Sequence, residues 1–476
     1  MIADLKPYAE YKDSGLPWLG MIPPHWSLQK LKHLTRFVNG LPFKPGSWCE
    51  RGVPIIRIQN LNGSNNFNYT DRRDLPQELL IRPGDLLFAW SGNRGTSFGP
   101  TIWERDFAGY LNQHIFKLDG YSLDTRYFAY VLRAVTRNIE DEKTHGIIGL
   151  VHITKPELGT TQVPIASPRE QTAIVRFLDW ANKRLVHTIR AKQKVIALLN
   201  EQKQAIIHRA VMRGLDPSVP LKPSDIPWLG DIPLHWEMPL FGRLLRGVEQ
   251  GWSPVGAEGE IALDQWTVLT LSSVRRGTFN PSEIKPVSRK ATIPSGIEIH
   301  DGDILLTRSN TRDRVGDVCI VRNARNRTIL CDLIYRLRVR ESEIVPEFLV
   351  YQLLSRVGRA QIEQDARGSS GTMPKISQRH IKSWRILLPP TNEQMDIVHR
   401  IDADCAPILT AISRLEREID LLREYRTRLV DDVVTGKLDV REAAAKLPVE
   451  EQTIEPEELV EGDSEMVEDE ITEPVG

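Results

Sequence analysis

The chain has 476 residues, of which 41% are apolar and 26% charged, as expected of a globular protein with two to four domains. No apolar run approaches the roughly 20 residues of a membrane span, and the first residues lack the apolar core of a signal peptide. The four cysteines show no C-x-x-C spacing and the 11 histidines are scattered, which gives no metal signature. We therefore expect a cytoplasmic, reduced and metal-free protein.

The net charge of −1 hides a strong asymmetry along the chain. Residues 450–476 contain 12 acidic and no basic residues, so their removal leaves a net charge of +11 on residues 1–449. A basic body with an acidic tail is typical of nucleic-acid binders. A solvated surface with a disordered, solubilising tail explains the charges equally well. We expect residues 441–476 to form an acidic, disordered tail.

A proline- and tryptophan-rich motif opens each half of the chain. The pattern P-W-L-G-x-I-P-x-H-W spans Pro17–Trp26 and recurs at Pro227–Trp236. Prolines at this density exclude a regular helix, and the tryptophans indicate an extended segment anchored to the start of a domain. His25 and His235 are expected to be structural, because the sequence shows no obvious carboxylate or nucleophile partner near either of them.

Each motif is followed by short β-type runs, one helical stretch, a Gly-rich loop and an exit strand. This pattern predicts two mixed α/β domains over residues 1–165 and 217–390. In the first half the predicted strands and helix cover Val53–Leu61, Gly84–Trp90, Asn112–Leu118 and Asp124–Asn138. In the second half they cover Trp266–Val274, Gly302–Arg308, Leu333–Val339 and Pro346–Gln364.

A long helix is predicted over Pro168–Arg213, within a segment of residues 166–216. It contains no glycine, and its only proline is its first residue, where a helix tolerates one. At 1.5 Å per residue it would extend about 69 Å, and its narrow apolar seam requires a partner helix. The seam residues are Val175, Leu178, Leu185, Ile189, Ile196, Leu199, Ile206 and Ala210.

The partner helix is predicted 223 residues further on, within residues 391–440. Its matching seam residues are Val398, Ile401, Ile408, Ile412, Ile419, Leu422, Leu429 and Val433. Two unrelated amphipathic helices could share such a period, but Glu170-Gln171 also returns as Glu393-Gln394, which favours an internal duplication. We expect an antiparallel coiled coil, with a kink or break near Asp404 caused by Pro407.

This layout resembles the DNA-specificity (S) subunit of a type I restriction–modification system, from about Tyr11 to Ala445. The resemblance is carried by the two opening motifs, by Pro83–Leu87 and its counterpart Gly302–Leu305, and by the close of the second helix at Val433–Asp439. It implies two target recognition domains that each read half of a split DNA sequence, held apart by the helices. It also implies two methyltransferase (M) subunits and restriction (R) subunits as partners.

Loop residues able to bond base edges are the candidate DNA contacts, because Arg and Lys suit guanine while Asn and Gln suit adenine. The two clusters that follow the Gly-Asp motifs are the strongest candidates, since they occupy equivalent places in the two halves. In the first half the candidates are Gln59, Asn60, Asn62, Asn65, Asn66, Arg72, Arg73, Ser91, Asn93, Arg94, His145, His152 and Lys155. In the second half they are Arg275, Arg276, Arg308, Ser309, Asn310, Arg312, Arg314, Arg367, Ser369, Ser370 and Lys375. Asn and Ser in loops are more often turn formers, so only a minority is expected to touch bases.

The sequence shows no phosphate-binding loop for ATP and no N-P-P-[YF] methyltransferase motif. We therefore expect a non-catalytic binding subunit, with S-adenosylmethionine, ATP and Mg²⁺ supplied through the assembled complex. The first long helix carries 10 basic and 3 acidic residues and residues 391–436 carry 6 and 10, which favours pairing and leaves faces for methyltransferase docking. The alternatives are a coiled-coil scaffold with two protein-binding β-rich modules, and an enzyme with motifs not evident here.

Overall fold

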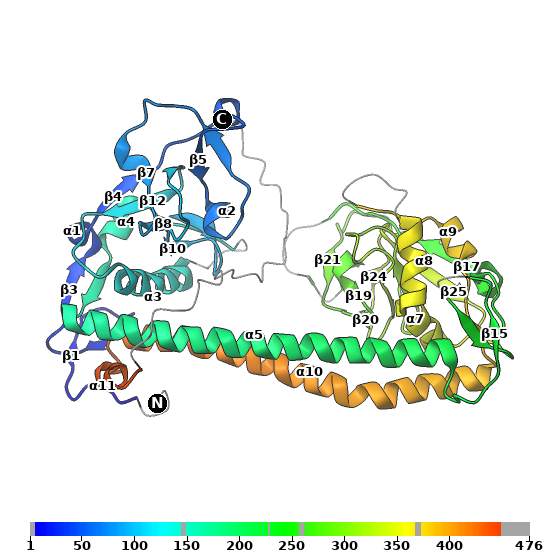
Figure 1. Ribbon diagram of the computed structural model, residues 1–476. Helices are drawn as coiled ribbons and strands as arrows, with labels where there is room; N and C mark the ends of the chain where they lie inside the picture. The colour runs from blue at the N-terminus through cyan, green and yellow to red at the C-terminus, as the bar shows by residue number, and fades with distance from the viewer. Residues whose placement is uncertain are drawn as a thin grey trace. The chain divides into compact units, whose positions relative to one another are not determined.

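The computed structural model describes residues 5–143, 149–226, 229–256, 261–262, 264–366 and 373–448 (Figure 1). The chain divides into two compact units, unit 1 with Met1–Ala191 and Glu418–Gly476, and unit 2 with Lys192–Arg417. Each long helix therefore contributes one part to each unit. Among the described helices none is long and apolar enough to cross a membrane.

Unit 1 is built on two four-stranded sheets. The first is antiparallel, in the order β10 (Gly99–Ile102), β8 (Leu86–Ala89), β12 (Ile115–Asp119), β4 (Arg36–Asn39). The second has the order β6 (Asn68–Thr70), β5 (Val53–Ile56), β11 (Gly109–Leu111), β7 (Leu80–Ile81), with β5 and β11 parallel. Helix α3 (Thr125–Lys143) packs its apolar face against β10 and the core beneath it. Shorter elements are α1 (Leu31–Leu34), α2 (Ile58–Leu61), β9 (Ser91–Asn93), β13 (Leu150–His152), α4 (Lys155–Thr160), and the pair β3 (Ser27–Lys30) and β14 (Gln162–Ile165).

Unit 2 repeats this plan. Its main sheet has the antiparallel order β17 (Leu245–Gln250), β25 (Ile334–Val339), β22 (Ile304–Thr307), β23 (Val318–Ile320). Its second sheet has the order β21 (Ile284–Pro286), β18 (Thr267–Leu269), β24 (Thr328–Ile329), with β18 and β24 parallel. A hairpin joins β19 (Val274–Arg275) to β20 (Thr278–Phe279). The helices are α6 (Phe241–Leu244), α7 (Pro346–Leu354), α8 (Arg356–Ala366) and α9 (Gln378–Ser383). The predicted fold class, two mixed α/β domains with two long helices, is confirmed.

The element boundaries differ from the predicted ones in two informative places. Val53–Leu61 is strand only to Ile56 and then turns into α2, because Asn60 closes a tight turn with Arg57. The single helix predicted over Pro346–Gln364 is two helices that separate at Ser355. The buried Ser355 hydroxyl donates to the Gln352 carbonyl and ends α7 there.

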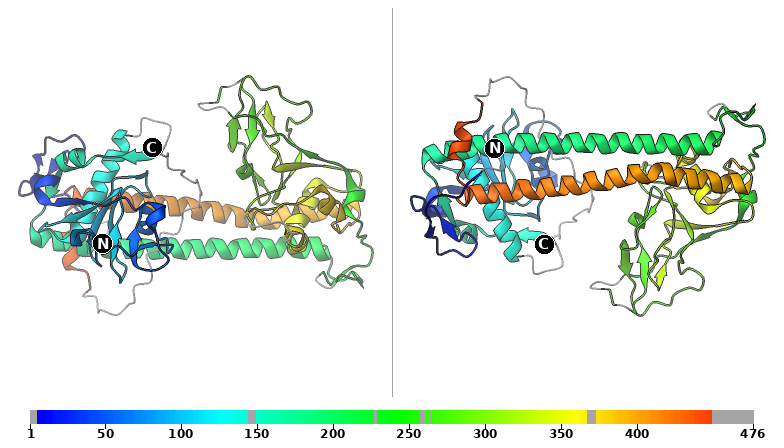
Figure 2. Two further views of the ribbon diagram at one scale, coloured as in Figure 1. Left: turned by 90° about the horizontal axis from the view of Figure 1, so that it is seen from above. Right: turned by 90° about the horizontal axis from the view of Figure 1, so that it is seen from below.

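The long helices α5 (Pro168–Arg213) and α10 (Thr391–Val434) pair antiparallel within each unit. In unit 1 the first part of α5 shares a core with the last part of α10, through residues such as Phe177, Leu178 and Val433 (Figures 1 and 2). In unit 2 the end of α5 shares a core with the start of α10, through Val211 and Ile401 among others. This pairing buries the apolar stripe that neither helix covers alone.

Most predicted seam residues are buried, but the seam is not uniform. Val175, Ile196, Leu199, Ile206 and Leu422 are only partly buried. Ile174 and Ile207, each next to a predicted position, are nearly inaccessible at 1% and 3% exposure. Near its ends each long helix packs against a domain core as well as against the other helix. Residues beside the seam, such as Ile174 and Ile207, are therefore buried there.

The expected break at Pro407 does not occur, because α10 runs without interruption from Thr391 to Val434. Pro407 is exposed, while its neighbours Cys405 and Ile408 are 4% and 7% exposed. The carbonyl that loses its donor belongs to Ala403, which lies on the same exposed face. The buried neighbours keep the helix in place.

The Glu-Gln pair at the start of each long helix joins that helix to its domain. The carboxylate accepts a bond from the opening motif, with His25 Nε2 2.9 Å from Glu170 and His235 Nε2 2.8 Å from Glu393. The expectation that these histidines lack a carboxylate partner is thus wrong, although a structural role fits the contact. The partners are 145 and 158 residues away in sequence, too far for a local pattern to show.

The glutamine of each pair holds the backbone at the start of a domain helix. Gln171 accepts from the Asp124 amide before α3, and Gln394 accepts from the Val345 amide before α7. The amide nitrogen of Gln394 also donates to the Glu343 and Pro389 carbonyls at 3.0 and 2.9 Å. These bonds lock three chain segments of unit 2 together.

Glycines end both long helices against the opening tryptophans. Gly436 has φ +78°, and a Cβ there would lie 2.4 Å from Pro23 and 3.1 Å from Trp26. Gly214 has φ +70°, and a Cβ there would meet Glu393 and Trp236 at 3.0 and 3.3 Å. Each opening motif therefore packs on the start of one long helix and the end of the other.

The segment assigned to the tail begins with folded residues. Helix α11 (Arg441–Ala445) buries Ala444 in the unit 1 core, and Leu447 is 5% exposed. Arg176 donates to the Leu447 carbonyl at 2.7 Å. The acidic residues 450–476 lie outside the described part of the chain.

Replacing Gln394 by alanine should destabilise unit 2, because the buried side chain satisfies one backbone amide and two carbonyls. We expect a loss of about 3 kcal/mol in the free energy of unfolding, measured by chemical denaturation. Gln202→Ala, on the exposed face of α5, is the control and should change it by less than about 0.5 kcal/mol. Equal effects of the two changes would contradict the role given to Gln394.

Candidate nucleic-acid interface

The Gly-Asp motifs are structural supports beneath the candidate loops. Asp85 accepts from the Arg82 amide and bonds Lys117 at 2.6 Å, while Asp303 accepts from the His300 amide and bonds Arg336 at 3.0 Å. Arg336 is 2% exposed and Asp303 6% exposed, so this pair belongs to the core. The motif therefore fixes the turn before the central strand in both units.

The structure brings the loop after each Gly-Asp strand against the exit segment of the same domain. In unit 1, β9 pairs with β13, so that Ser91 faces His152 across the ladder. In unit 2, Ser309 and Lys375 form the corresponding bridge. Residues about 60 positions apart in the sequence thus meet at one edge in each unit.

The unit 1 edge is dominated by rings. The Trp90 ring lies 5.0 Å from the rings of His114 and His152. Asn93 and Arg94 are exposed beside it, and the Gly95 amide donates to Glu140 at 2.8 Å. Arg94 itself pairs with Asp141 on α3. The loop is therefore held by carboxylates of α3 while its tip stays open to solvent.

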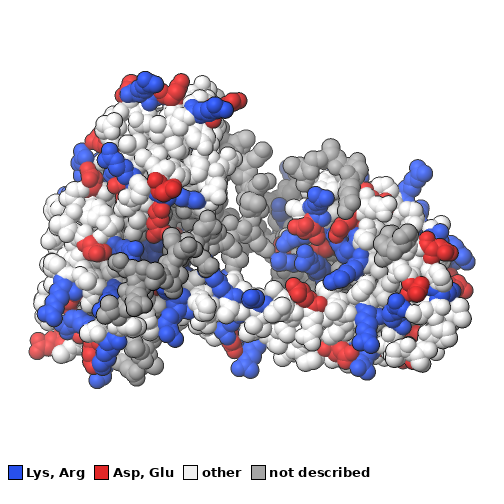
Figure 3. Space-filling model, viewed as in Figure 1, with Lys and Arg blue, Asp and Glu red and all other residues white. Residues whose placement is uncertain are grey.

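The unit 2 edge is dominated by arginines around one buried carboxylate. Asp317 is 1% exposed, and Arg276, Arg314 and Arg359 lie near it. Burial raises the pKa of Asp317, and these arginines oppose the shift without cancelling it. Figure 3 shows Lys and Arg side chains, with some acidic ones, gathered over the region of β19–β21. The unit 2 edge thus combines several arginines with a buried carboxylate, where the unit 1 edge carries rings.

Several candidates are exposed enough to meet a ligand. Among those with exposed side chains are Gln59, Asn62, Asn65, Asn66, Arg72, Arg73, Asn93, Arg94, His152, Lys155, Arg275, Arg276, Arg312 and Lys375. Ser91, Arg308 and Arg314 are partly buried. Some are engaged within the domain: Arg72 pairs with Asp74 at 2.8 Å, and Lys155 Nζ donates to the Phe37 carbonyl. Such contacts must be exchanged before these two side chains can reach DNA.

Three candidates have buried side chains. Asn60 is 3% exposed and bonds the Arg57 amide and the Ser64 and Asn66 carbonyls. Ser309 and Asn310 are 1% and 8% exposed, and Asn310 accepts from the Thr311 amide. Burial argues against direct base contact by these residues.

His145, Arg367, Ser369 and Ser370 lie outside the described residues. Sequence reasoning missed Trp90 and His114, because only the strand pairing places them at the edge. The positive φ of 75° at His114, outside the region that β-strands occupy, has no sequence signal of its own.

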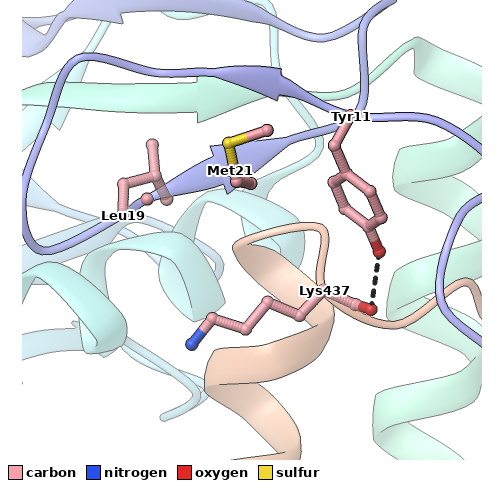
Figure 4. A pocket seen from close by; sticks show the side chains of 5 residues that line it. Tyr11, Leu19, Met21 and Lys437 are labelled. Atoms are coloured by element: carbon pink, nitrogen blue, oxygen red, sulfur yellow. Dashed lines mark hydrogen bonds between the residues drawn. The ribbon is translucent and has the colours of Figure 1, made fainter.

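The described residues contain no group of three or more His, Cys, Asp or Glu side chains that could hold a metal ion. An open, apolar pocket of about 390 Å³ lies elsewhere in unit 1, between the opening motif and the end of α10 (Figure 4). Tyr11, Leu19, Gly20, Met21 and Lys437 line it, and the Tyr11 hydroxyl donates to the Lys437 carbonyl at 3.0 Å. This pocket contains none of the candidate loop residues.

Comparison with known proteins matches the chain to a family model and to several specificity subunits of type I restriction enzymes. A model of the type I restriction modification DNA specificity domain matches residues 26–197. The chain is 26% identical over 247 residues to the EcoEI specificity subunit of Escherichia coli, covering 52% of this chain and only 41% of that subunit. It is 24% identical over 470 residues to the StySPI specificity subunit of Salmonella potsdam, covering 90% and 96%.

Among solved structures, one chain is described as "Structural basis underlying complex assembly and conformational transition of the type I R-M system". It superposes with a TM-score of 0.56 at 16% identity, covering 88% of this chain and 99% of that one. At this identity the likeness shows the fold.

Asn60→Ala should destabilise unit 1, because the Asn60 side chain is 3% exposed and makes three hydrogen bonds to backbone groups. We expect a loss of about 2 kcal/mol in the free energy of unfolding, measured by denaturation. Asn62→Ala, at the exposed end of the same turn, should cost less than about 0.5 kcal/mol. If the Asn60→Ala protein is as stable as the unaltered protein but binds DNA differently, Asn60 is a DNA contact instead.

Proposed function

Because the chain belongs to the type I restriction–modification DNA-specificity family, we propose that unit 1 and unit 2 each read one half of a bipartite DNA target. The observation that supports this is the edge formed in both units by the post-Gly-Asp loop and the exit segment. The two edges share a backbone frame but carry different side chains. Two unlike readers on one repeated frame suit a split, non-palindromic sequence.

The long helices are proposed to fix the separation of the half-sites. Successive faces of the major groove recur about every 34 Å, so two readers need a rigid spacer. Antiparallel helices with a packed seam supply that rigidity, and the Glu-Gln pairs join the spacer to each domain. The spacer is expected to set distance and orientation while contributing few base contacts.

Two methyltransferase subunits are proposed to dock on the outer faces of the helices. Leu198 of α5 is 54% exposed and Leu421 of α10 is 57% exposed. They are related by the 223-residue repeat, and their neighbours Leu199 and Leu422 are seam residues. Paired, equivalent apolar side chains outside the seam favour two copies of one partner.

The chain itself is proposed to be non-catalytic. S-adenosylmethionine, ATP and Mg²⁺ would then be bound by the methyltransferase and restriction subunits of the complex, which acts on DNA in the cytoplasm.

Arg312→Ala tests the reading role of the unit 2 loop, because Arg312 is exposed and follows the buried Ser309 and Asn310. A base-reading arginine should contribute about 1–3 kcal/mol and specify one position of the second half-site. Methylation-sensitive sequencing of host DNA should show that position relaxed. Arg322→Ala, which removes an exposed partner of Glu347 in the same unit, is the control and should leave the motif unchanged. An unaltered motif in both variants would exclude Arg312 as a reader.

Leu198→Glu and Leu421→Glu test the docking faces. Each change should weaken one methyltransferase contact about tenfold or more, since burial of a leucine contributes roughly 1.5–3 kcal/mol. Native mass spectrometry should show one bound methyltransferase for either single variant and none for the double variant. Met395→Glu alters another exposed apolar residue of α10, whose repeat mate is Thr172, and should leave two bound. Full assembly of the double variant would place docking elsewhere.

A further inference from the structure

One framework position in each unit is occupied by chemically opposite residues, Trp90 in unit 1 and Arg308 in unit 2. Each is the residue directly after the central strand, β8 or β22. The Trp90 amide donates to the His114 carbonyl at 3.0 Å, and the Arg308 amide donates to the Leu333 carbonyl at 2.8 Å. The backbone amides of the two residues therefore make equivalent hydrogen bonds.

The backbone carbonyls of Trp90 and Arg308 also make equivalent hydrogen bonds. The Trp90 carbonyl accepts from the Ile153 amide at 3.0 Å, and the Arg308 carbonyl accepts from the Ile376 amide at 2.9 Å. The residue before each of these isoleucines is His152 in unit 1 and Lys375 in unit 2. His152 pairs with Ser91, and Lys375 pairs with Ser309. Trp90 therefore corresponds to Arg308, and His152 corresponds to Lys375.

The unit 1 position is a stack of neutral rings. Trp90 stacks on Phe116 with centroids 5.7 Å apart and an interplanar angle of 25°. His152 meets it edge-on at 5.0 Å. These side chains offer flat apolar surface and the His152 ring nitrogens to a ligand, but no permanent charge. The Trp90 ring nitrogen, like Arg308 Nε, is buried without a hydrogen-bond partner among the described residues.

The unit 2 position holds two permanent cations. The Arg308 guanidinium lies 5.7 Å from the centroid of Tyr335. Tyr335 corresponds to Phe116. Tyr335 pairs with Leu306 of β22, and Phe116 pairs with Phe88 of β8. Leu306 and Phe88 occupy the same place in their strands, two residues before Arg308 and Trp90. Arg308 Nε is buried without a hydrogen-bond partner among the described residues, so a ligand that draws the guanidinium outward would satisfy it. Lys375 is exposed on the adjoining segment.

We propose that Arg308 and Lys375 form a binding site for a DNA backbone phosphate, and that unit 1 makes its contact at the same place without charge, through Trp90 and His152. Lysine and arginine release condensed counterions when they neutralise phosphates, whereas stacked rings do not. The salt dependence of DNA binding therefore resides more in unit 2 at this position. This inference rests on the proposed function, and it assigns the charge to one reader.

The test uses the full chain and a duplex carrying the bipartite motif obtained from host methylation. Affinity is measured at pH 8, where free histidine is uncharged, over a range of salt concentrations. Arg308→Gln with Lys375→Gln should reduce the slope of log K against log salt by about 0.9, because the proposed site neutralises one phosphate. His152→Gln, the matched control, should leave the slope unchanged. His152→Lys should steepen the slope by about 0.9.

Three results would overturn the phosphate site. One is an unchanged slope in the Arg308/Lys375 double variant, and a fall in affinity with that unchanged slope would assign the two cations to base edges instead. Another is an equal loss of slope in His152→Gln. If the double variant does not fold, judged by its thermal transition, an unchanged slope in His152→Lys decides against the proposal.

Failure of the proposed function gives a different pattern. Equal affinity of the unaltered chain for motif and scrambled duplexes would overturn sequence reading. The slopes of the variants on either duplex would still report whether Arg308 and Lys375 bind phosphate.

Discussion

The contact on which the rest of the structure depends is the Glu-Gln pair in the first turn of each long helix. A coiled coil can set a distance between two readers only if each reader cannot turn on the end of its helix. The glutamate bonds the opening motif, and the glutamine bonds the backbone that starts α3 or α7. Gln171 and Gln394 are 4% and 0% exposed, so water does not compete for these bonds. The orientation of each domain on its part of the helices follows from them.

Periodicity and repetition were sufficient to predict the fold, because both are properties of the sequence itself. The 223-residue offset correctly paired the seam of α5 with that of α10, and the prediction of two α/β domains needed only strand and turn signals. The failures came where tertiary context decides. Pro407 leaves the helix intact because it lies on the exposed face together with Ala403, whose carbonyl loses its donor. Ile174 rather than Val175 is fully buried because a domain core covers the helix end. No local pattern contains that information.

The candidate site was harder to predict, because a turn-forming and a base-reading side chain look the same in a sequence. Asn60 and Asn62 are two residues apart in one loop. The Asn60 side chain is buried and makes three hydrogen bonds to the backbone, whereas Asn62 is exposed. The difference arises because the chain folds back over Asn60 and brings the Ser64 and Asn66 carbonyls within hydrogen-bonding distance of its side chain. Trp90 and Arg308 end the two predicted strands that begin with Gly-Asp, so the sequence already aligns them. Only the backbone bonds show that both residues are held in the same way.

Those backbone bonds explain how one frame can serve two readers. The residue after the central strand is held through its own amide and carbonyl, to His114 and Ile153 in unit 1 and to Leu333 and Ile376 in unit 2. Because none of these bonds uses its side chain, the frame tolerates an indole in one unit and a guanidinium in the other. The helices and the Glu-Gln pairs depend instead on particular side chains, so they stay alike in both halves. Reading chemistry can thus change at the edge of a domain while the bonds that orient the domain remain the same.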